Sequence, residues 1–176
     1  MSNSLEALTR PLETSEIDFR VQSINRGGYV TLLAYKDARC DMKRLDEAFG
    51  PLGWKREHYG VNNNLYCRVS VWNPDIDQWI CKSDVGTESF SDAVKGEASD
   101  AFKRACFNLG IGRELYDYPV IKFRLFENEW KMIGDKPKVT YDFKLRSWHW
   151  QSSFKDGVLQ TLEAYDENGL LRYEYK

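Results

Sequence analysis

Residues 95–117 read KGEASDAFKRACFNLGIGRELYD, and this stretch decides how the rest of the chain is interpreted. Its apolar residues recur every three or four positions, which is the spacing of one buried helix face. They are Ala98, Ala101, Phe102, Ala105 and Leu109. Lys103 and Arg104 fall on the opposite, polar side, where periodicity alone indicates a solvated surface. Gly110 and Gly112 are typical helix terminators, so we predict a helix over residues 89–110.

Upstream of this helix, the pattern predicts a helix, a hairpin, a second helix and a meander. A short helix at 5–9 ends before Pro11, and β-rich runs within 19–35 flank the turn residues 25–28, NRGG. The second helix, 37–50, has Asp37 as its expected N-cap. Alternating residues over 65–72 and a further run over 79–85 then predict meander strands joined by a turn at 73–75.

Downstream, residues 120–176 read almost entirely as β structure. The segment 139–150, VTYDFKLRSWHW, alternates, and the last residues form a hairpin around Asn168-Gly169. We therefore predict an α+β fold with a β-rich C-terminal extension. The expected domains are a core over 1–119 and the extension over 120–176.

Composition limits the class of protein. The chain has 176 residues, 42% hydrophobic and 30% charged, which is typical of a globular protein. Its 25 basic and 27 acidic residues give a net charge of −2, which excludes a polybasic DNA-wrapping protein but permits a local basic groove. No apolar stretch approaches the roughly 18 residues of a membrane span. The first 20 residues hold no apolar block, so we expect no signal peptide and a cytoplasmic location.

Motifs for metal, cofactor or nucleotide chemistry are not evident. Cysteines stand at 40, 67, 81 and 106 without a CxxC pair, which indicates reduced and mostly buried thiols instead of a zinc site. The segment 49–55, FGPLGWK, lacks the spacing and hydroxyl of a phosphate-binding loop. A nuclease reading would combine Asp75 with the Glu-x-Lys at 174–176, but about a hundred residues separate them. We expect no cofactor, no metal and no catalytic residue.

The second helix adds one unusual cation. Arg39 lies in its first turn, where the helix dipole disfavours positive charge, and this hints at another use. A groove that presents Arg39, Lys103 and Arg104 would bind a phosphate backbone through charge-assisted hydrogen bonds.

Four stretches, in order, resemble the Rad-fifty-two-type single-strand annealing proteins, in particular their short bacteriophage members, which are related to the RecT and Red-beta superfamily. They are LEALTRPLETSEIDFRVQ from residue 5, AYKDARCDMKRLDEAFGPLGW at 34–54, KSDVG at 82–86 and the opening segment 95–117. The last resembles the family's Lys-x-Glu-Ala-(Ser/Thr)-Asp-x-x-Lys-Arg-Ala helix. The resemblance covers roughly two thirds of the chain, to about residue 117.

The resemblance implies a closed ring of identical subunits that anneals complementary single-stranded DNA without ATP, for recombination and repair. It makes residues 1–119 the expected DNA-annealing and oligomerisation core. The family's inner DNA contacts map onto Arg39, Lys103 and Arg104, with Lys95 as a weaker candidate. The family's outer DNA site uses lysines on the meander side. Here the hairpin tip at 73–78, NPDIDQ, is acidic, which puts that site in doubt and leaves Lys82 as a guess.

Two other functions are open. The chain is also consistent with a protein that coats single strands without annealing them, with Tyr66, Trp72 and Trp79 as stacking platforms. For these three rings we favour core packing between sheet and helices. The nuclease is the second alternative. Single-stranded DNA and further copies of the chain are the expected partners, with a single-strand-binding protein or an exonuclease as additional partner classes.

Overall fold

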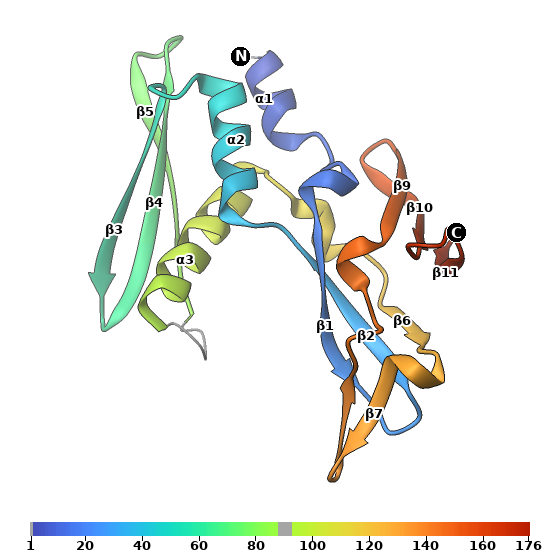
Figure 1. The fold of residues 1–176 in the computed structure, drawn as a ribbon. Coiled ribbons are helices and arrows are strands. Elements are labelled where there is room, and N and C mark those ends of the chain that lie inside the picture. Colours follow the sequence, from blue (N-terminus) through green and yellow to red (C-terminus); the bar gives the residue numbers. More distant parts are fainter. Residues whose placement is uncertain (1, 88–92) are drawn as a thin grey trace. The chain divides into compact units, whose positions relative to one another are not determined.

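The computed structural model describes residues 2–87 and 93–176 and shows a mixed α+β fold (Figure 1). The helices in the described residues are α1 (Ser2–Thr9), α2 (Ala38–Phe49) and α3 (Ala93–Leu109). The strands are β1 (Asp18–Ile24), β2 (Tyr29–Tyr35), β3 (Trp54–Val61), β4 (Asn64–Asn73), β5 (Gln78–Val85), β6 (Ile121–Arg124), β7 (Trp130–Ile133), β8 (Lys136–Val139), β9 (His149–Lys155), β10 (Val158–Tyr165) and β11 (Leu171–Tyr175). The predicted α+β class is confirmed. Residues 89–92 of the predicted third helix lie outside the described residues.

The chain packs as two compact units, each made of two stretches of sequence. Residues 1–11 and 36–113 form the first, which we call the helical unit. Residues 12–35 and 114–176 form the second, which we call the sheet unit. The hairpin β1–β2 therefore packs with the C-terminal strands, although it precedes α2 in sequence. The boundary at residue 119, where the sequence pattern changes to β structure, stays a prediction.

In the helical unit, the antiparallel meander β3–β4–β5 packs one face on α3 (Figure 1). Alternation along β4 turns Cys67, Val69 and Val71 toward Phe102 and its helical neighbours, and Cys67, Val69 and Phe102 are fully buried. At the end of β5, Gly86 lies so close to the backbone of α3 at Glu97 that a Cβ would collide with it. The predicted two-residue period of β4 is confirmed.

A buried arginine joins α1 to α2. Arg44 is completely buried and donates to the carbonyl oxygens of Ala7, Arg10 and Pro11 at 2.9, 3.3 and 3.2 Å. The last carbonyls of a helix have no partner inside the helix, so these bonds satisfy the end of α1. Arg44 is therefore a structural cation of the helical unit.

The sheet unit is built from three small antiparallel sheets, ordered β1–β2–β6, β11–β10–β9 and β7–β8. Strand β6 pairs with β2 from Tyr29↔Arg124 to Leu32↔Ile121. Their buried side chains share one core with the second sheet, and this core includes Val30, Leu32, Trp150 and Leu162. The predicted hairpin around Asn168-Gly169 is confirmed by the antiparallel pairing of β10 and β11.

The alternating segment 139–150 is mostly not a strand. Strand β8 ends at Val139 and β9 begins at His149, with turns and a short 3₁₀ helix, η4 (Leu145–Ser147), between them. Phe143 and Trp148 are nevertheless buried and pack edge to face, with ring centroids 5.4 Å apart. A loop that sends every few side chains into the core imitates the alternation of a strand.

Candidate functional site

Asp37 caps α2 and also holds the first candidate cation, Arg39. Its carboxylate accepts hydrogen bonds from the backbone N–H groups of Arg39 and Cys40 at 2.8 and 3.0 Å, as the sequence predicts for an N-cap. The Arg39 guanidinium pairs with the same carboxylate at 2.7 Å and remains 86% exposed. Partial burial alone would raise the pKa of Asp37, but these bonds lower it below its usual value. The carboxylate therefore offsets the unfavourable first-turn position of Arg39.

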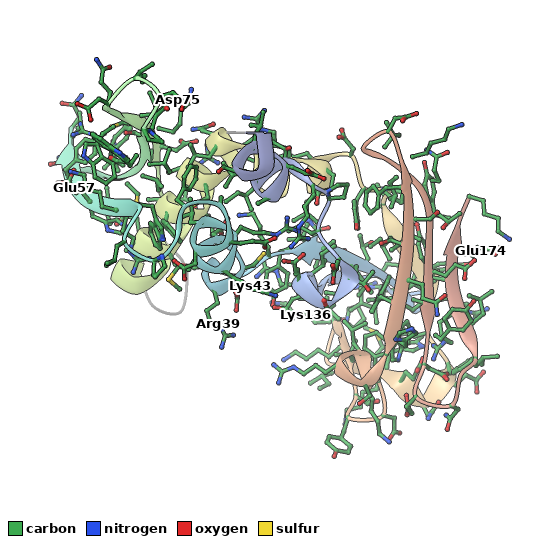
Figure 2. All side chains as sticks on the ribbon, turned by 90° about the horizontal axis from the view of Figure 1, so that it is seen from above. Arg39, Lys43, Glu57, Asp75, Lys136 and Glu174 are labelled. Atoms are coloured by element: carbon green, nitrogen blue, oxygen red, sulfur yellow. The ribbon has the colours of Figure 1, made fainter. Side chains whose placement is uncertain are left out.

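Lys43 is a cation that the sequence reasoning missed. It follows Arg39 by four residues on α2, is exposed, and therefore shares the same helix face. Figure 2 labels both residues on α2, and Arg39 projects away from the ribbon. The i, i+4 spacing on the predicted helix was the signal that would have found Lys43.

Lys103 and Arg104 are neighbours in sequence but lie on different flanks of α3. Lys103 is half-buried, and its charge acts on Asp41 of α2. Arg104 turns to the meander instead, where its Nε donates to Asp84 of β5 at 3.3 Å. Successive helix residues diverge by about 100°, so one polar side is divided between two neighbours. The structure therefore brings Lys103 toward α2, and Arg104 toward β5.

A buried ion pair lies beneath this surface. The ammonium of Lys36, 7% exposed, donates to Oδ1 of Asp41, which is completely buried. Oδ2 of Asp41 has no hydrogen-bond partner among the described residues. Burial raises the pKa of Asp41 to about 6, although Lys36 and Lys103 act in the opposite direction. A carboxylate with one unsatisfied oxygen thus lies in the field of Lys103.

The other sequence candidates divide between the two units. Lys95 belongs to the helical unit, in α3, and its side chain lies outside the description. Asp75 lies in the helical unit, whereas Glu174 and Lys176 lie in the sheet unit and pair with each other at 2.5 Å. Among the described residues, no group of three or more Asp, Glu, His or Cys side chains is arranged to hold a metal ion.

Three of the four cysteines are buried, as expected, and Cys81 on β5 is exposed. Burial raises the pKa of the Cys67 thiol to about 11 and that of Cys106 well above its usual value. A raised pKa disfavours the reactive thiolate, so these two thiols are inert packing residues.

The expectation that Tyr66, Trp72 and Trp79 pack between sheet and helices is wrong. Tyr66 and Trp72 alternate with the buried residues of β4, so they point away from α3, and Trp79 pairs with Trp72 in register. Trp79 is 39% exposed, and neither it nor the other two rings belongs to the core of the helical unit. The meander therefore carries aromatic residues on the face that α3 does not cover.

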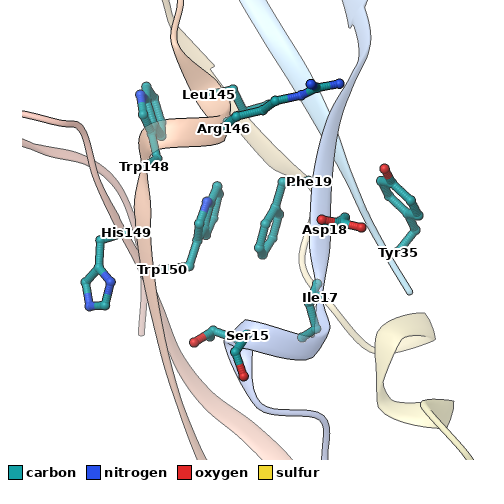
Figure 3. Close-up of a pocket in the computed structure, with 11 residues that line it drawn as sticks. Ser15, Ile17, Asp18, Phe19, Tyr35, Leu145, Arg146, Trp148, His149 and Trp150 are labelled. Atoms are coloured by element: carbon teal, nitrogen blue, oxygen red, sulfur yellow. The ribbon is translucent and has the colours of Figure 1, made fainter. Parts of the chain in front are cut away.

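A cleft of about 570 Å³ lies in the sheet unit, and Figure 3 shows its lining. Phe19 of β1 and Trp150 of β9 stack inside it with ring centroids 3.6 Å apart and an interplanar angle of 6°. Asp18, Arg146 and His149 are the lining residues with acidic or basic side chains. The two rings stack on each other, so this contact joins the sheet that contains β1 to the sheet that contains β9.

No helix in the described residues is both long enough and apolar enough to span a bilayer. The candidate surface consists of cations on α2 and α3 of the helical unit: Arg39 and Lys43 on one face of α2, Lys103 on the side of α3 whose charge acts on α2, and Arg104 on the flank toward β5. Cations of this kind are the groups that proteins use to neutralise the phosphates of a nucleic acid.

The chain is similar to known DNA-binding and DNA-repair proteins. Over 94 residues the chain is 37% identical to the single-stranded DNA-binding protein DdrA of Deinococcus radiodurans, a match that covers 50% of this chain and 42% of that protein. The match thus spans less than half of the relative's length. A family model of double-strand break repair proteins matches residues 1–125, which include α1 to α3, the meander and β6. The chain belongs to the Rad52/22 family of double-strand break repair proteins.

Proposed function

We propose that this protein binds single-stranded DNA and anneals complementary strands without ATP, as a ring of identical subunits. Family membership over residues 1–125 carries the proposal, because that region holds all the cations of the candidate surface. The name of the related DdrA supports the single-strand specificity.

The charges on α2 and α3 suit a phosphate backbone. Arg39 is 86% exposed, and exposed Lys43 lies one turn along the same face. Lys103 makes no ion pair within 4 Å among the described residues, so it is available for an anion. Each phosphate neutralised on a single strand contributes a salt slope of about −0.7. Three contacts per subunit then give a slope of about −2 for each subunit engaged.

Oligomerisation makes these few cations sufficient. A chain with net charge −2 binds DNA weakly as a monomer. Copies arranged side by side along one strand engage it together, and avidity multiplies the contacts. Annealing then requires that the backbone be held and the base edges remain free, and base pairing supplies the energy. No catalytic residue is needed.

The test is annealing of two complementary oligonucleotides without ATP or metal, followed by fluorescence quenching, with mass photometry on the same sample. We expect faster duplex formation together with a large oligomer. Tight binding without acceleration would place the protein among coating proteins. Absence of binding would refute the proposal.

Substitution tests the surface itself. The triple change Arg39→Ala, Lys103→Ala and Arg104→Ala should weaken single-strand binding and flatten its salt dependence, with the circular dichroism spectrum unchanged. A matched control replaces Arg124, Arg146 and Lys155, which are likewise two arginines and one lysine, all exposed in the sheet unit. If both triple variants lose affinity equally, the loss reflects net charge and the proposed surface is wrong. A single-strand-binding protein or an exonuclease as a further partner stays a prediction.

A further inference from the structure

A row of polar contacts joins the end of β5 to α3 within the helical unit. Thr87, just after β5, donates to the carboxylate of Asp100 through its backbone N–H and its hydroxyl, at 3.1 and 3.0 Å. Arg104 and Asn108 follow Asp100 on α3, and both donate to Asp84 of β5. Because these three helix residues are spaced four apart, they lie on one face of α3.

Three donors converge on the carboxylate of Asp84. Its Oδ1 accepts from the N–H of Val85 at 2.8 Å and from Nε of Arg104 at 3.3 Å, and its Oδ2 accepts from Nδ2 of Asn108 at 3.2 Å. Asn108 also donates to the carbonyl oxygen of Ser83 at 3.2 Å. Each carboxylate oxygen therefore has a donor other than Arg104, so the carboxylate is held in place without it.

Arg104 uses only one edge of its guanidinium in this row. The group carries five N–H donors in a planar fork, and the Nε–H is the one that donates to Asp84. In the part of the chain that the structure describes, its Nη1 and Nη2 make no hydrogen bond. The Arg104 side chain is 43% exposed and that of Asp84 is 23% exposed. The carboxylate is thus mostly covered, whereas the arginine has unused donors and access to solvent.

We propose that Asp84 is the positioning residue for Arg104: its carboxylate fixes the plane of the guanidinium, and Nη1 and Nη2 then donate to a backbone phosphate of single-stranded DNA. The proposal rests on the single-strand binding proposed above and adds a residue of β5 that does not itself touch the strand. A guanidinium whose plane is already fixed loses less freedom on binding, and its fork matches two phosphate oxygens. An acidic side chain thereby strengthens the binding of an anion.

The opposite role predicts the opposite sign. If Asp84 only neutralises Arg104, its removal strengthens DNA binding, because a negative charge near the phosphates disappears. If Asp84 positions Arg104, its removal weakens binding, because a free guanidinium must be ordered when the strand binds. The direction of the change in affinity therefore separates the two roles.

The experiment measures the affinity of the full chain for oligothymidylate of about 30 nucleotides by fluorescence anisotropy. We expect Asp84→Ala to weaken binding about threefold or more. Asp84→Asn keeps an oxygen for the donors of Val85 and Arg104, so its affinity should stay within about twofold of the wild-type value. Stronger binding by Asp84→Ala, or equal changes in the two variants, would refute the positioning role.

A double-mutant cycle tests whether Asp84 acts through Arg104. In the Arg104→Ala background the phosphate contact is already lost, so adding Asp84→Ala should cause no further loss of affinity. Each single variant should also reduce the salt slope by about 0.7 for each subunit engaged, because one phosphate contact is lost. If Asp84→Ala weakens binding as much without Arg104 as with it, Asp84 acts on the fold of the site and the proposal is refuted.

Thr87→Val is the matched control for the packing of α3. It removes the neighbouring hydrogen bond from the Thr87 hydroxyl to Asp100 and leaves Arg104 untouched. We expect it to leave the affinity for oligothymidylate unchanged. A loss equal to that of Asp84→Ala would assign the effect to a loosened contact between β5 and α3, and would overturn the proposal.

The single variant Arg104→Ala separates this proposal from the proposed function. If it binds oligothymidylate as tightly as the wild-type protein, Arg104 is no phosphate ligand. The role of Asp84 is then refuted, while single-strand binding through Arg39 and Lys103 stands. If the wild-type protein binds no single-stranded DNA, both proposals fail.

Discussion

Each of the two units buries an ionic cluster, and the two clusters differ in how fully their charges are paired. In the sheet unit, Arg172 makes a bidentate pair with Glu129 at 2.9 and 2.7 Å and reaches Asp166 at 3.4 Å. Phe126 and Trp148 flank the guanidinium, with centroids 4.0 and 4.7 Å from it. In the helical unit, Lys36 satisfies only one oxygen of Asp41, and the other has no partner among the described residues.

The acidic groups of the two clusters respond in opposite directions. Burial raises the pKa of Asp166, but the N–H groups of Leu170 and Asn168 and the nearby Arg172 lower it more, so the net pKa lies below its usual value. Burial dominates at Asp41 and raises its pKa to about 6. A satisfied cluster is suited to holding a fold together. The unsatisfied one lies beside the proposed binding surface, where its charge acts on Lys103.

The largest expected effect comes from breaking the satisfied cluster. Arg172→Met keeps much of the side-chain volume but leaves the buried Glu129 without its cation. We expect the free energy of unfolding to fall by about 3–5 kcal/mol, measured by urea denaturation. Arg146→Met, which removes an exposed arginine of the same unit, should change it by less than about 0.5 kcal/mol. A loss below about 1 kcal/mol for Arg172→Met would contradict the structural role.

A change of pH should affect the two units with opposite signs. Because the folded pKa of Asp41 lies above its ordinary 3.8, the folded state binds more protons between pH 3.8 and about 6. The contribution of Asp41 is therefore complete at low pH and is lost as pH rises through 6, by at most about 3 kcal/mol. The lowered pKa of Asp166 gives a contribution that is present above its ordinary value and lost only as pH falls below about 3.8.

Hydrogen exchange resolved by segment checks this contrast. We expect amides of α2 to gain protection between pH 7 and 5, after correction for intrinsic exchange rates, while those of β10 do not. Asp41→Asn should abolish the gain in α2. The same slope in both units, or a slope that survives Asp41→Asn, would show that Asp41 is not the titrating group.

The smallest effect concerns DNA affinity. Asp41→Asn removes the negative charge that acts on Lys103, so we expect oligothymidylate binding at low salt to strengthen about two- to threefold. Fluorescence anisotropy at two salt concentrations measures it, because the gain should shrink as salt rises. Asp75→Asn, an equal charge change at the exposed hairpin tip of the same unit, is the control. An equal gain in both variants would assign the effect to net charge alone.

Local chemistry made most of the fold predictable. Asp37 predicts the start of α2, and Asn168-Gly169 predicts the last hairpin. The two-residue period of β4 predicts its buried face. Each of these signals acts over only a few residues. The alternation over 139–150 indicates a strand that the structure lacks, because Phe143 and Trp148 enter the core from a loop with strand-like spacing. The packing of β1–β2 with β6 and the later strands of the sheet unit depends on long-range contacts, which no local pattern encodes.

The candidate site was only partly visible in the sequence. Helical periodicity predicts that Lys103 and Arg104 share one polar side of α3. It does not predict the positions of α2 and β5, toward which Lys103 and Arg104 respectively turn. The pairing of Lys36 with Asp41 joins a residue before the helix to one inside it, so helical spacing does not reveal it. The aromatic character of Tyr66, Trp72 and Trp79 favours core packing, because aromatic residues are most often buried. The register that turns them away from α3 becomes clear only once α3 occupies the other side of the meander.

The order of the two units along the chain also affects how the protein folds during synthesis. The hairpin β1–β2 is made early, but the residues that cover Val30 and Leu32 extend to Leu162 and Ala164. At ribosomal rates the intervening roughly 130 residues require on the order of ten seconds. During that interval all residues of the helical unit are synthesised and can fold, while the apolar side of the hairpin is not yet covered by the later strands. A nascent chain stalled before β9 would therefore expose an aggregation-prone hairpin and should be a substrate for chaperones.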